Sequence, residues 1–182
     1  MIIIDGLNNS FSDTVEQFQF DGDGVTLSIA NVRQLIIDES STENADLIVG
    51  FAGADTINAL GGDDFIDAGN GNDIIDSGPG NDFIILGDGS DSFVFSDGDG
   101  NDIIEDNGAG DTDRVIFDGF DSLDATFTQD NGDDLIVSFA NGESVTVING
   151  LGGSFTDNIE IFEFDDVSLT ISEIIDMLPA VV

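Results

Sequence analysis

The stretch GNGNDIIDSGPGNDFIILGDGSDSFV, residues 69–94, decides the fold of this chain. It repeats a unit of nine residues, in which a glycine-rich turn leads through an aspartate into a short apolar run. A fixed period of this size predicts a solenoid, in which one small structural unit stacks on copies of itself. The aspartates keep the nine-residue spacing before and through this stretch, at Asp46, Asp55, Asp64, Asp73, Asp82 and Asp91.

Each unit predicts a turn followed by a strand of three residues. A large apolar residue stands two places after each aspartate, and the alternation of side chains along a strand directs it inward. Two units make one coil of eighteen residues, so turns on the same edge of the solenoid come from every second unit. The inward residues are Ile48, Ile57, Ile66, Ile75, Ile84 and Phe93, and the predicted aspartate pairs are Asp46 with Asp64, Asp55 with Asp73, Asp64 with Asp82, and Asp73 with Asp91.

The chemistry of the turns predicts bound calcium. Glycines such as Gly78 and Gly80 allow positive φ, so a turn can direct several backbone carbonyls toward one point. Aspartate adds a hard carboxylate, and Ca²⁺ accepts six to eight oxygen ligands in flexible geometry. We expect roughly five ions, shared between stacked turns. The expected ligands are Asp46, Asp55, Asp64, Asp73, Asp82, Asp91 and Asp102, with the turn backbones at Gly53, Gly62, Gly69, Gly71, Gly78, Gly80, Gly87 and Gly89.

The repeat changes its spacing after Asp91. The next interval is eleven residues, through Asp102 to Asp113, and Ile104 and Val115 keep the inward position. We therefore expect the solenoid to widen there and to give way to antiparallel strands. We include Asp102 among the ligands and leave Asp113 out.

Composition limits the partners that such a chain can have. Two basic residues, Arg33 and Arg114, face 39 acidic ones, and the formal charge is -37. Nucleic acid and anionic membrane surfaces are excluded as partners, because both require a basic surface. A charge of this size opposes compaction unless cations neutralise it. Yet 40% of the residues are hydrophobic, which is too many for a disordered acidic tail.

The residue types also exclude several kinds of site. The chain has no cysteine, histidine, tryptophan, tyrosine or lysine, which removes disulfides, thiolate or imidazole metal sites and Ser-His or Cys-His catalysis. An EF-hand beginning at Asp97 fails, because Asp102 and Gly108 stand where that loop requires glycine and glutamate. A carboxylate-pair glycosidase and a halophilic surface without calcium remain weaker alternatives. We expect the protein not to be an enzyme.

The sequence divides into three segments: a β-strand cap over 1–42, the repeats over 43–117, and a β-strand domain with a short terminal helix over 118–182. Residues 29–37, IANVRQLII, read as a short helix followed by a strand. The two flanks repeat each other. IIIDGLNNSFSDTVEQFQFDGDGVTLSIANV, from Ile2, aligns with TVINGLGGSFTDNIEIFEFDDVSLTISEI, from Thr146, after a two-residue deletion.

The repeats resemble the repeats-in-toxin (RTX) nonapeptide GGxGxDxUx, in which U is a large apolar residue. This resemblance covers residues 44 to about 117 and implies a calcium-bound parallel β-roll, an all-β fold, flanked here by antiparallel capping strands. The tail, with GDDLIVSFANGESVTVINGL and IEIFEFDDVSLTISEI, resembles the domain that often follows such repeats in large secreted bacterial proteins. The family further implies type I export through an uncleaved carboxy-terminal signal. Asn44, Phe51 and Leu60 replace expected glycines, which predicts weaker first turns.

One apolar feature has no place inside the solenoid. Leu47, Phe65 and Phe83 each follow a motif aspartate directly, lie eighteen residues apart and should point outward. A stacked row of this kind must be covered or used. Either the flanking strands of the same chain cover it, or a second molecule does.

Together these features predict a calcium-binding structural protein of the bacterial cell surface or surroundings, without a cleaved amino-terminal signal. We expect it to fold on extracellular Ca²⁺ and to build a matrix, filament, surface layer or adhesin by head-to-tail self-association or as tandem modules. The alternative is the carboxy-terminal export module of a larger secreted toxin, lipase or protease.

Overall fold

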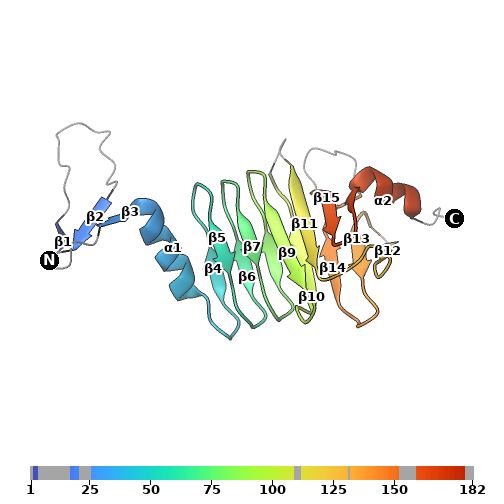
Figure 1. Cartoon of the computed structure of the whole chain (residues 1–182), viewed down its shortest axis with the longest axis horizontal. Coiled ribbons are helices and arrows are strands. Elements are labelled where there is room, and N and C mark those ends of the chain that lie inside the picture. The colour runs from blue at the N-terminus through green and yellow to red at the C-terminus, as the bar shows by residue number, and fades with distance from the viewer. Residues whose placement is uncertain are drawn as a thin grey trace.

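The computed structural model describes residues 2–3, 17–20, 26–108, 112–130, 132–151 and 159–178. Short strands that wind into successive coils form an elongated β-roll, with a helix at each end (Figure 1). The sequence predicts this parallel β-roll, and the prediction is confirmed. Within the described residues no helix is long and apolar enough to cross a membrane.

The roll has two parallel sheets, whose strands come alternately from successive nine-residue units. We call them the β8 sheet and the β7 sheet. Strands of the nine-residue units pair with an offset of eighteen residues, as in Leu47 with Phe65 and Ile57 with Ile75, and the offset grows to 20 for β8 with β10 and 22 for β9 with β11. In the β8 sheet lie β4 (Leu47–Val49), β6 (Phe65–Asp67), β8 (Phe83–Ile85) and β10 (Asn101–Glu105). In the β7 sheet lie β5 (Thr56–Asn58), β7 (Ile74–Asp76), β9 (Ser92–Ser96) and β11 (Asp113–Asp118).

The core lies between the two sheets. The inward side chains predicted from the repeat, from Ile48 to Phe93, are all buried. Burying one such side chain contributes about 1.5–3 kcal/mol, so each three-residue strand is held mainly by its single inward residue. Where the spacing lengthens the roll widens, and phenylalanines fill the added width. Phe117 stacks on Phe164 with ring centroids 4.7 Å apart, and Phe120 stacks on Phe139 at 4.0 Å.

The carboxy-terminal strands extend both sheets of the roll. β14 (Ser144–Val147) pairs in parallel with β10, and β15 (Ile159–Phe164) pairs in parallel with β11. The expected antiparallel strands follow one step further out, as β12 (Thr126–Gln129) and β13 (Leu135–Ser138) beyond β14, and β16 (Ser168–Thr170) beyond β15. Helix α2 (Ile171–Met177) follows β16 and buries Ile171 and Ile174. The antiparallel cap thus joins the roll through one parallel strand in each sheet.

The amino-terminal flank forms a small sheet of β1 (Ile2–Ile3), β2 (Gln17–Phe20) and β3 (Thr26–Ser28), followed by α1. The helix spans Ile29–Ser40, so the strand expected at the end of 29–37 is wrong. Ser28 and Asn31 form a reciprocal capping box at its start, which favours a continuous helix. Ile37 enters the core of the roll, whereas the neighbouring Leu35 and Ile36 stay about half exposed.

The duplicated flanks have corresponding backbone pairings. In β2 and β3, Phe18 lies opposite Leu27, and in β15 and β16, Phe162 lies opposite Leu169. In both flanks a helix with a capping box follows directly. Residues 4–16 and 152–158, which hold much of the matched sequence, lie outside the described residues.

Candidate calcium sites

Two rows of turns hold the motif aspartates, one along each edge of the roll. We call them the Asp82 row, with the turns that end at Asp46, Asp64, Asp82 and Asp102, and the Asp73 row, with those that end at Asp55, Asp73, Asp91 and Asp113. Within each row the backbone N–H of one aspartate donates to Oδ1 of the next, as from Asp64 to Asp82 and from Asp55 to Asp73, both at 2.7 Å. The structure therefore brings together all four pairs that the spacing predicts, the others being Asp46 with Asp64 and Asp73 with Asp91.

These carboxylates are buried, and only one of their two oxygens has a partner in several of them. Asp64, Asp73, Asp82 and Asp102 are each at most 3% exposed. Their Oδ2 atoms make no hydrogen bond. A buried oxygen without a partner costs free energy, and an unpaired buried carboxylate costs more. Each row thus holds a line of buried oxygens that a cation would stabilise.

Burial also changes the acidity of these groups. Burial raises the pKa of Asp73 to about 6, and the charge of Asp55 adds to the rise. Burial likewise raises the pKa of Asp82 to about 6 and that of Asp102 to about 8. The neighbouring carboxylates of Asp82 and Asp99 contribute to the shift of Asp102. Hydrogen bonds from the stacked backbone oppose these shifts without cancelling them.

The glycines allow the turns to stack closely. Gly78 has φ of 72°, in the left-handed region, as the sequence predicts. Gly80 does not have positive φ, and that prediction is wrong. Glycine is required at this position for another reason, because a Cβ on Gly80 would collide with the carbonyl of Gly62 in the preceding coil. Backbone carbonyls of one turn thus lie directly against the next turn.

The residues present fit calcium. In the described part of the chain, no group of three or more carboxylate, thiol or imidazole side chains converges on one point. A metal ion would therefore bind between two stacked aspartates and the carbonyls of their glycine-rich turns. All of these donors are hard oxygens, which calcium prefers and which softer metals do not. When bound, the ion would supply the positive charge that the buried Oδ2 atoms lack.

The first coil differs from those that follow. Asp46 accepts hydrogen bonds from the backbone and hydroxyl of Thr42, both at 2.7 Å, and Asp55 accepts one from the backbone of Phe51 at 2.6 Å. Neither carboxylate has a preceding coil to bond. Leu60, which replaces a motif glycine, has φ of 76°. The expectation that the first turns are weaker sites remains a prediction, and these contacts give it a structural basis.

The aspartate row continues past the predicted limit. Asp102 joins the Asp82 row, since its Oδ1 accepts the N–H of Asp82 at 3.0 Å. Asp113, which we left out, joins the Asp73 row in the same way, at 2.7 Å from the N–H of Asp91. It is 1% exposed. The sequence signal for Asp113 is Val115, which stands two residues later in the inward position. The longer interval of eleven residues lengthens the connecting loop, and Val115 still lies beside the inward Phe93 of the preceding coil.

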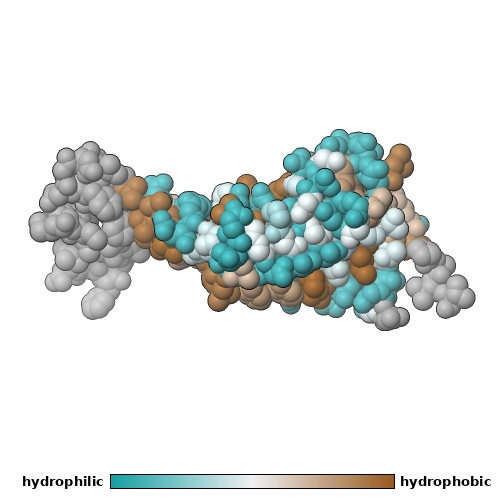
Figure 2. Space-filling view, turned by 90° about the horizontal axis from the view of Figure 1, so that it is seen from below, coloured by the Kyte–Doolittle hydropathy of each residue, from teal (hydrophilic) through white to brown (hydrophobic). Residues whose placement is uncertain are grey.

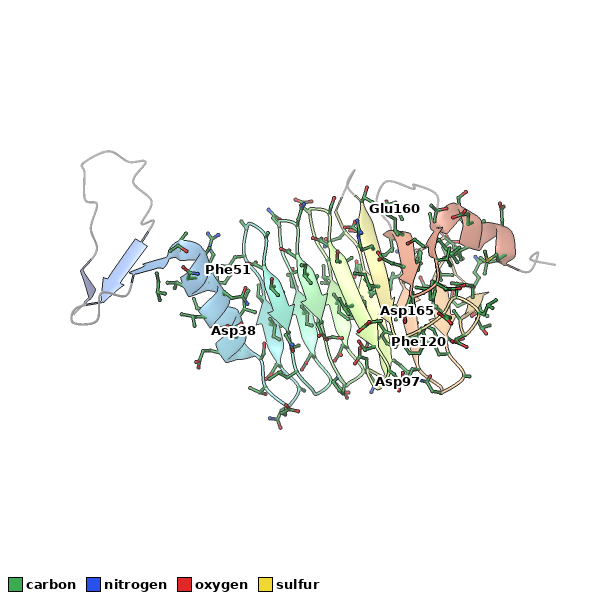
Figure 3. All side chains as sticks on the ribbon, in the orientation of Figure 1. Asp38, Phe51, Asp97, Phe120, Glu160 and Asp165 are labelled. Atoms are coloured by element: carbon green, nitrogen blue, oxygen red, sulfur yellow. The ribbon has the colours of Figure 1, made fainter. Side chains whose placement is uncertain are left out.

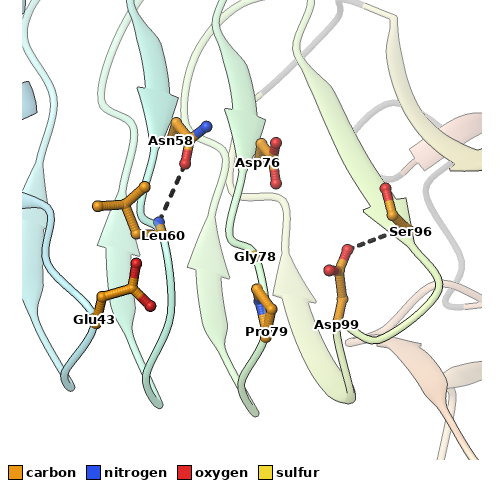
Figure 4. Close-up of a pocket in the computed structure, with 8 residues that line it drawn as sticks. All are labelled: Glu43, Asn58, Leu60, Asp76, Gly78, Pro79, Ser96 and Asp99. Carbon is orange, nitrogen blue, oxygen red and sulfur yellow. Dashed lines mark hydrogen bonds between the residues drawn. The ribbon is translucent and has the colours of Figure 1, made fainter.

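A second pair of acidic residues lies where two strands of the β7 sheet end. Asp76 is the last residue of β7, and Asp99 follows β9. A hollow of about 420 Å³ has Asp76 and Asp99 among its lining residues, together with Leu60 and Pro79 (Figure 4). Burial raises the pKa of both carboxyls, and the charge of Asp76 raises that of Asp99 further. The N–H of Ser96 donates to Asp99 at 2.5 Å. The sequence does not distinguish these two residues from the other acids, because they fall outside the motif position.

Comparison with known protein families identifies the repeat segment. The family model for the RTX calcium-binding nonapeptide repeat (four copies) matches residues 41–75, 49–84 and 61–93. These matches cover the first five strands of the roll and the beginning of the sixth. No curated protein sequence matches the chain.

Among solved structures, the chain is similar to the AlgE6R3 subunit of the mannuronan C5-epimerase from Azotobacter vinelandii. The match has 25% identity, covers 59% of this chain and 72% of the other, and has a TM-score of 0.44. The extracellular lipase LipA from Serratia marcescens is similar at 16% identity over 63% of this chain, with a TM-score of 0.31. The matched region spans 37% of that lipase.

Proposed function

Because residues 41–93 are RTX calcium-binding nonapeptide repeats, we propose that this protein is a secreted structural module, without catalytic activity, that folds when it meets extracellular calcium. The observation that supports the proposal best is the line of buried Oδ2 atoms in the stacked turns, at Asp64, Asp73, Asp82 and Asp102. A formal charge of -37 opposes a compact state through self-repulsion, and divalent ions bound in those turns would reduce that repulsion.

The magnitudes are consistent with folding that depends on calcium. Extracellular modules typically bind calcium with Kd of about 10⁻⁴–10⁻³ M, well above the free calcium of the cytosol. At ten times Kd, each independent site adds about 1.4 kcal/mol to the stability of the folded state. Roughly five sites then supply about 7 kcal/mol, which is comparable to the whole stability of an ordinary domain. The chain would stay unfolded and exportable inside the cell and fold after it emerges.

Calcium titration tests this proposal directly. We expect far-ultraviolet circular dichroism and sedimentation velocity to report an expanded chain in chelator and a compact β-rich one in millimolar calcium, with magnesium far less effective. A chelated sample with the same compact shape and the same melting temperature as the calcium-loaded one would disprove the proposal.

We further propose that copies of the chain associate through the outward face of the β8 sheet. Leu47 is 67% exposed and Phe65 41%, so the described flanks of the same chain do not cover this face. Phe65 stacks on Phe83 with ring centroids 5.5 Å apart and planes 5° from parallel. Figure 2 shows apolar surface along one long border of the roll. Two such faces are identical and can pack about a two-fold axis, which would give a dimer as the unit of a larger extracellular assembly.

A further inference from the structure

The first coil of a solenoid has a problem that inner coils do not. In inner coils, one carbonyl of each turn in the Asp73 row accepts an N–H from the coil before it. Gly53 donates in this way to the carbonyl of Asn70 at 2.5 Å, and Gly71 donates to Asp88 at 2.7 Å. The equivalent carbonyl of the first turn in the Asp73 row is that of Ala52, which has no coil before it. Ala52 is exposed, so this carbonyl has either water or a side chain as its donor in place of the missing coil.

Helix α1 supplies that donor from a side chain. Nη1 of Arg33 donates to the carbonyl of Ala52 at 2.8 Å. The guanidinium also lies over the ring of Phe51, 5.4 Å from its centroid, in a cation–π contact. Phe51 stands where the motif has glycine, and Figure 3 shows it at the junction of α1 and the roll. One of only two basic residues in the chain is thus placed on one of the few departures from the repeat.

The neighbouring residue of the helix completes the edge of the first strand. In a parallel sheet the N–H and C=O of one residue face the same adjacent strand. In the next coil, Ile74 uses this arrangement when its N–H donates to the carbonyl of Asp55 at 3.0 Å. Thr56 has no preceding strand, and the side-chain amide of Gln34 takes its place. Nε2 of Gln34 donates to the carbonyl of Thr56 at 2.6 Å, and Oε1 accepts the N–H of Thr56 at 3.4 Å.

The same end of the roll has a hollow of about 360 Å³, which Arg33, Gln34 and Asp55 help to line. Asp55 is 8% exposed. The hollow thus combines a motif carboxylate and a turn carbonyl, the donor types found between inner coils, with the guanidinium of Arg33. Arg33 brings a positive charge to the same hollow as Asp55, whose Oδ2 accepts the N–H of Phe51.

We propose that α1 is a metal-free end cap for the Asp73 row. Gln34 replaces the strand peptide of a missing coil. Arg33 replaces both its N–H donor and the cation that would neutralise Asp55. The row of calcium sites in this edge therefore begins between Asp55 and Asp73, and no ion binds on the outer side of Asp55. This inference rests on the proposed binding of calcium to the inner turns. The cap does not extend to the β8 sheet, where Leu47 of the first strand is largely exposed.

Hydrogen exchange of the full chain in saturating calcium tests the cap. We expect Arg33→Met and Gln34→Glu each to speed exchange in residues 50–58 by about tenfold or more, with residues 74–94 unchanged, because only the end coil opens locally. Gln34→Glu keeps the size of the side chain and removes the donor to Thr56. Arg114→Met is the matched control, since it removes the other basic residue, 3.7 Å from Glu163 at the far end of the roll.

The effect of calcium on hydrogen exchange then shows whether Arg33 acts as a substitute for a metal cation or only as a packing contact. In Arg33→Met, calcium beyond the amount that saturates the inner coils should restore protection of residues 50–58, because the ion can now bind beside Asp55. Unchanged exchange at 50–58 in both variants, equal loosening of 74–94, or a loss that extra calcium does not restore would each overturn the proposal. The wild-type calcium titration reports separately on the proposed function, because it needs neither variant.

Discussion

At the scale of single residues, the stability of the protein depends on carboxylates that the fold buries. Asp73 and Asp82 have pKa values of about 6 and Asp102 of about 8, each above the value of 3.8 expected in an unfolded chain. The folded chain therefore binds more protons than the unfolded chain between these values. Its metal-free stability is fully present below about pH 4 and is lost as the pH rises toward 8.

This pH dependence predicts that protons can partly replace calcium in stabilising the fold. We expect the metal-free chain to retain more compact β structure at pH 5 than at pH 8, as measured by circular dichroism and sedimentation. The calcium concentration at the folding midpoint should rise over the same range, because calcium must replace the stabilisation that protons provide at low pH. Greater metal-free compaction at pH 8 would show that these carboxylates do not control folding.

A second residue-scale prediction concerns Leu60. A left-handed conformation costs a residue with a Cβ roughly 1–2 kcal/mol, and Leu60, with φ of 76°, is 41% exposed. We expect Leu60→Gly to raise the free energy of unfolding in saturating calcium by about 1 kcal/mol. The control is Gly78→Ala, at the same turn position one coil later, which should destabilise the protein, since its Cβ would collide with the backbone of Leu60. Urea denaturation measures both variants. If Leu60→Gly is less stable than the wild type, the left-handed conformation of Leu60 does not destabilise the protein.

At the scale of elements, each turn acts as a link between two coils. Oδ1 of Asp82 accepts the N–H of Asp64, and the N–H of Asp82 donates to Asp102. We expect Asp82→Asn to raise the calcium concentration at the folding midpoint by roughly tenfold, because two adjacent sites lose a charged ligand. Asp88→Asn removes the same charge from an exposed turn residue and should leave the midpoint almost unchanged. Equal shifts in the two variants would mean that net charge, and not ligation, sets the midpoint.

Elements also show how far the sequence predicts the structure. The nine-residue period identifies the strands from β4 to β9, their inward residues and the aspartate pairs, because every unit repeats the same local chemistry. The pattern does not predict what happens where the repeat ends. The apolar residues at the end of 29–37 predict a strand, whereas the structure has one continuous helix there, α1. The parallel pairing of β14 with β10 and of β15 with β11 joins residues more than forty positions apart.

The contacts of the end cap are equally invisible in the sequence. Arg33 and Gln34 are ordinary residues of an amphipathic helix until the first coil lies beside them. Asp113 could have been predicted from the phase of Val115, although the motif spacing excluded it. Local repetition is therefore readable from the sequence, whereas the chemistry of the ends arises only from tertiary contact.

At the scale of the whole molecule, the outward face of the β8 sheet decides whether copies associate. We expect the double variant Phe65→Ser and Phe83→Ser to abolish self-association in calcium while leaving the calcium-induced change in circular dichroism intact. Ile74→Ser is the matched control, because Ile74 is 50% exposed on the opposite sheet. Light scattering after size-exclusion chromatography measures the outcome. If the double variant assembles as the wild type does, this face is not the contact.

The arrangement of the strands across the long axis has a mechanical consequence (Figure 1). Tension applied along that axis meets hydrogen bonds that point in the direction of pull, so that coils would peel away one after another instead of shearing together. Every coil released would lengthen the chain by eighteen residues and set free the ions held on its two edges. Under load, such a molecule would behave as an extensible tether whose stiffness follows the concentration of calcium around it.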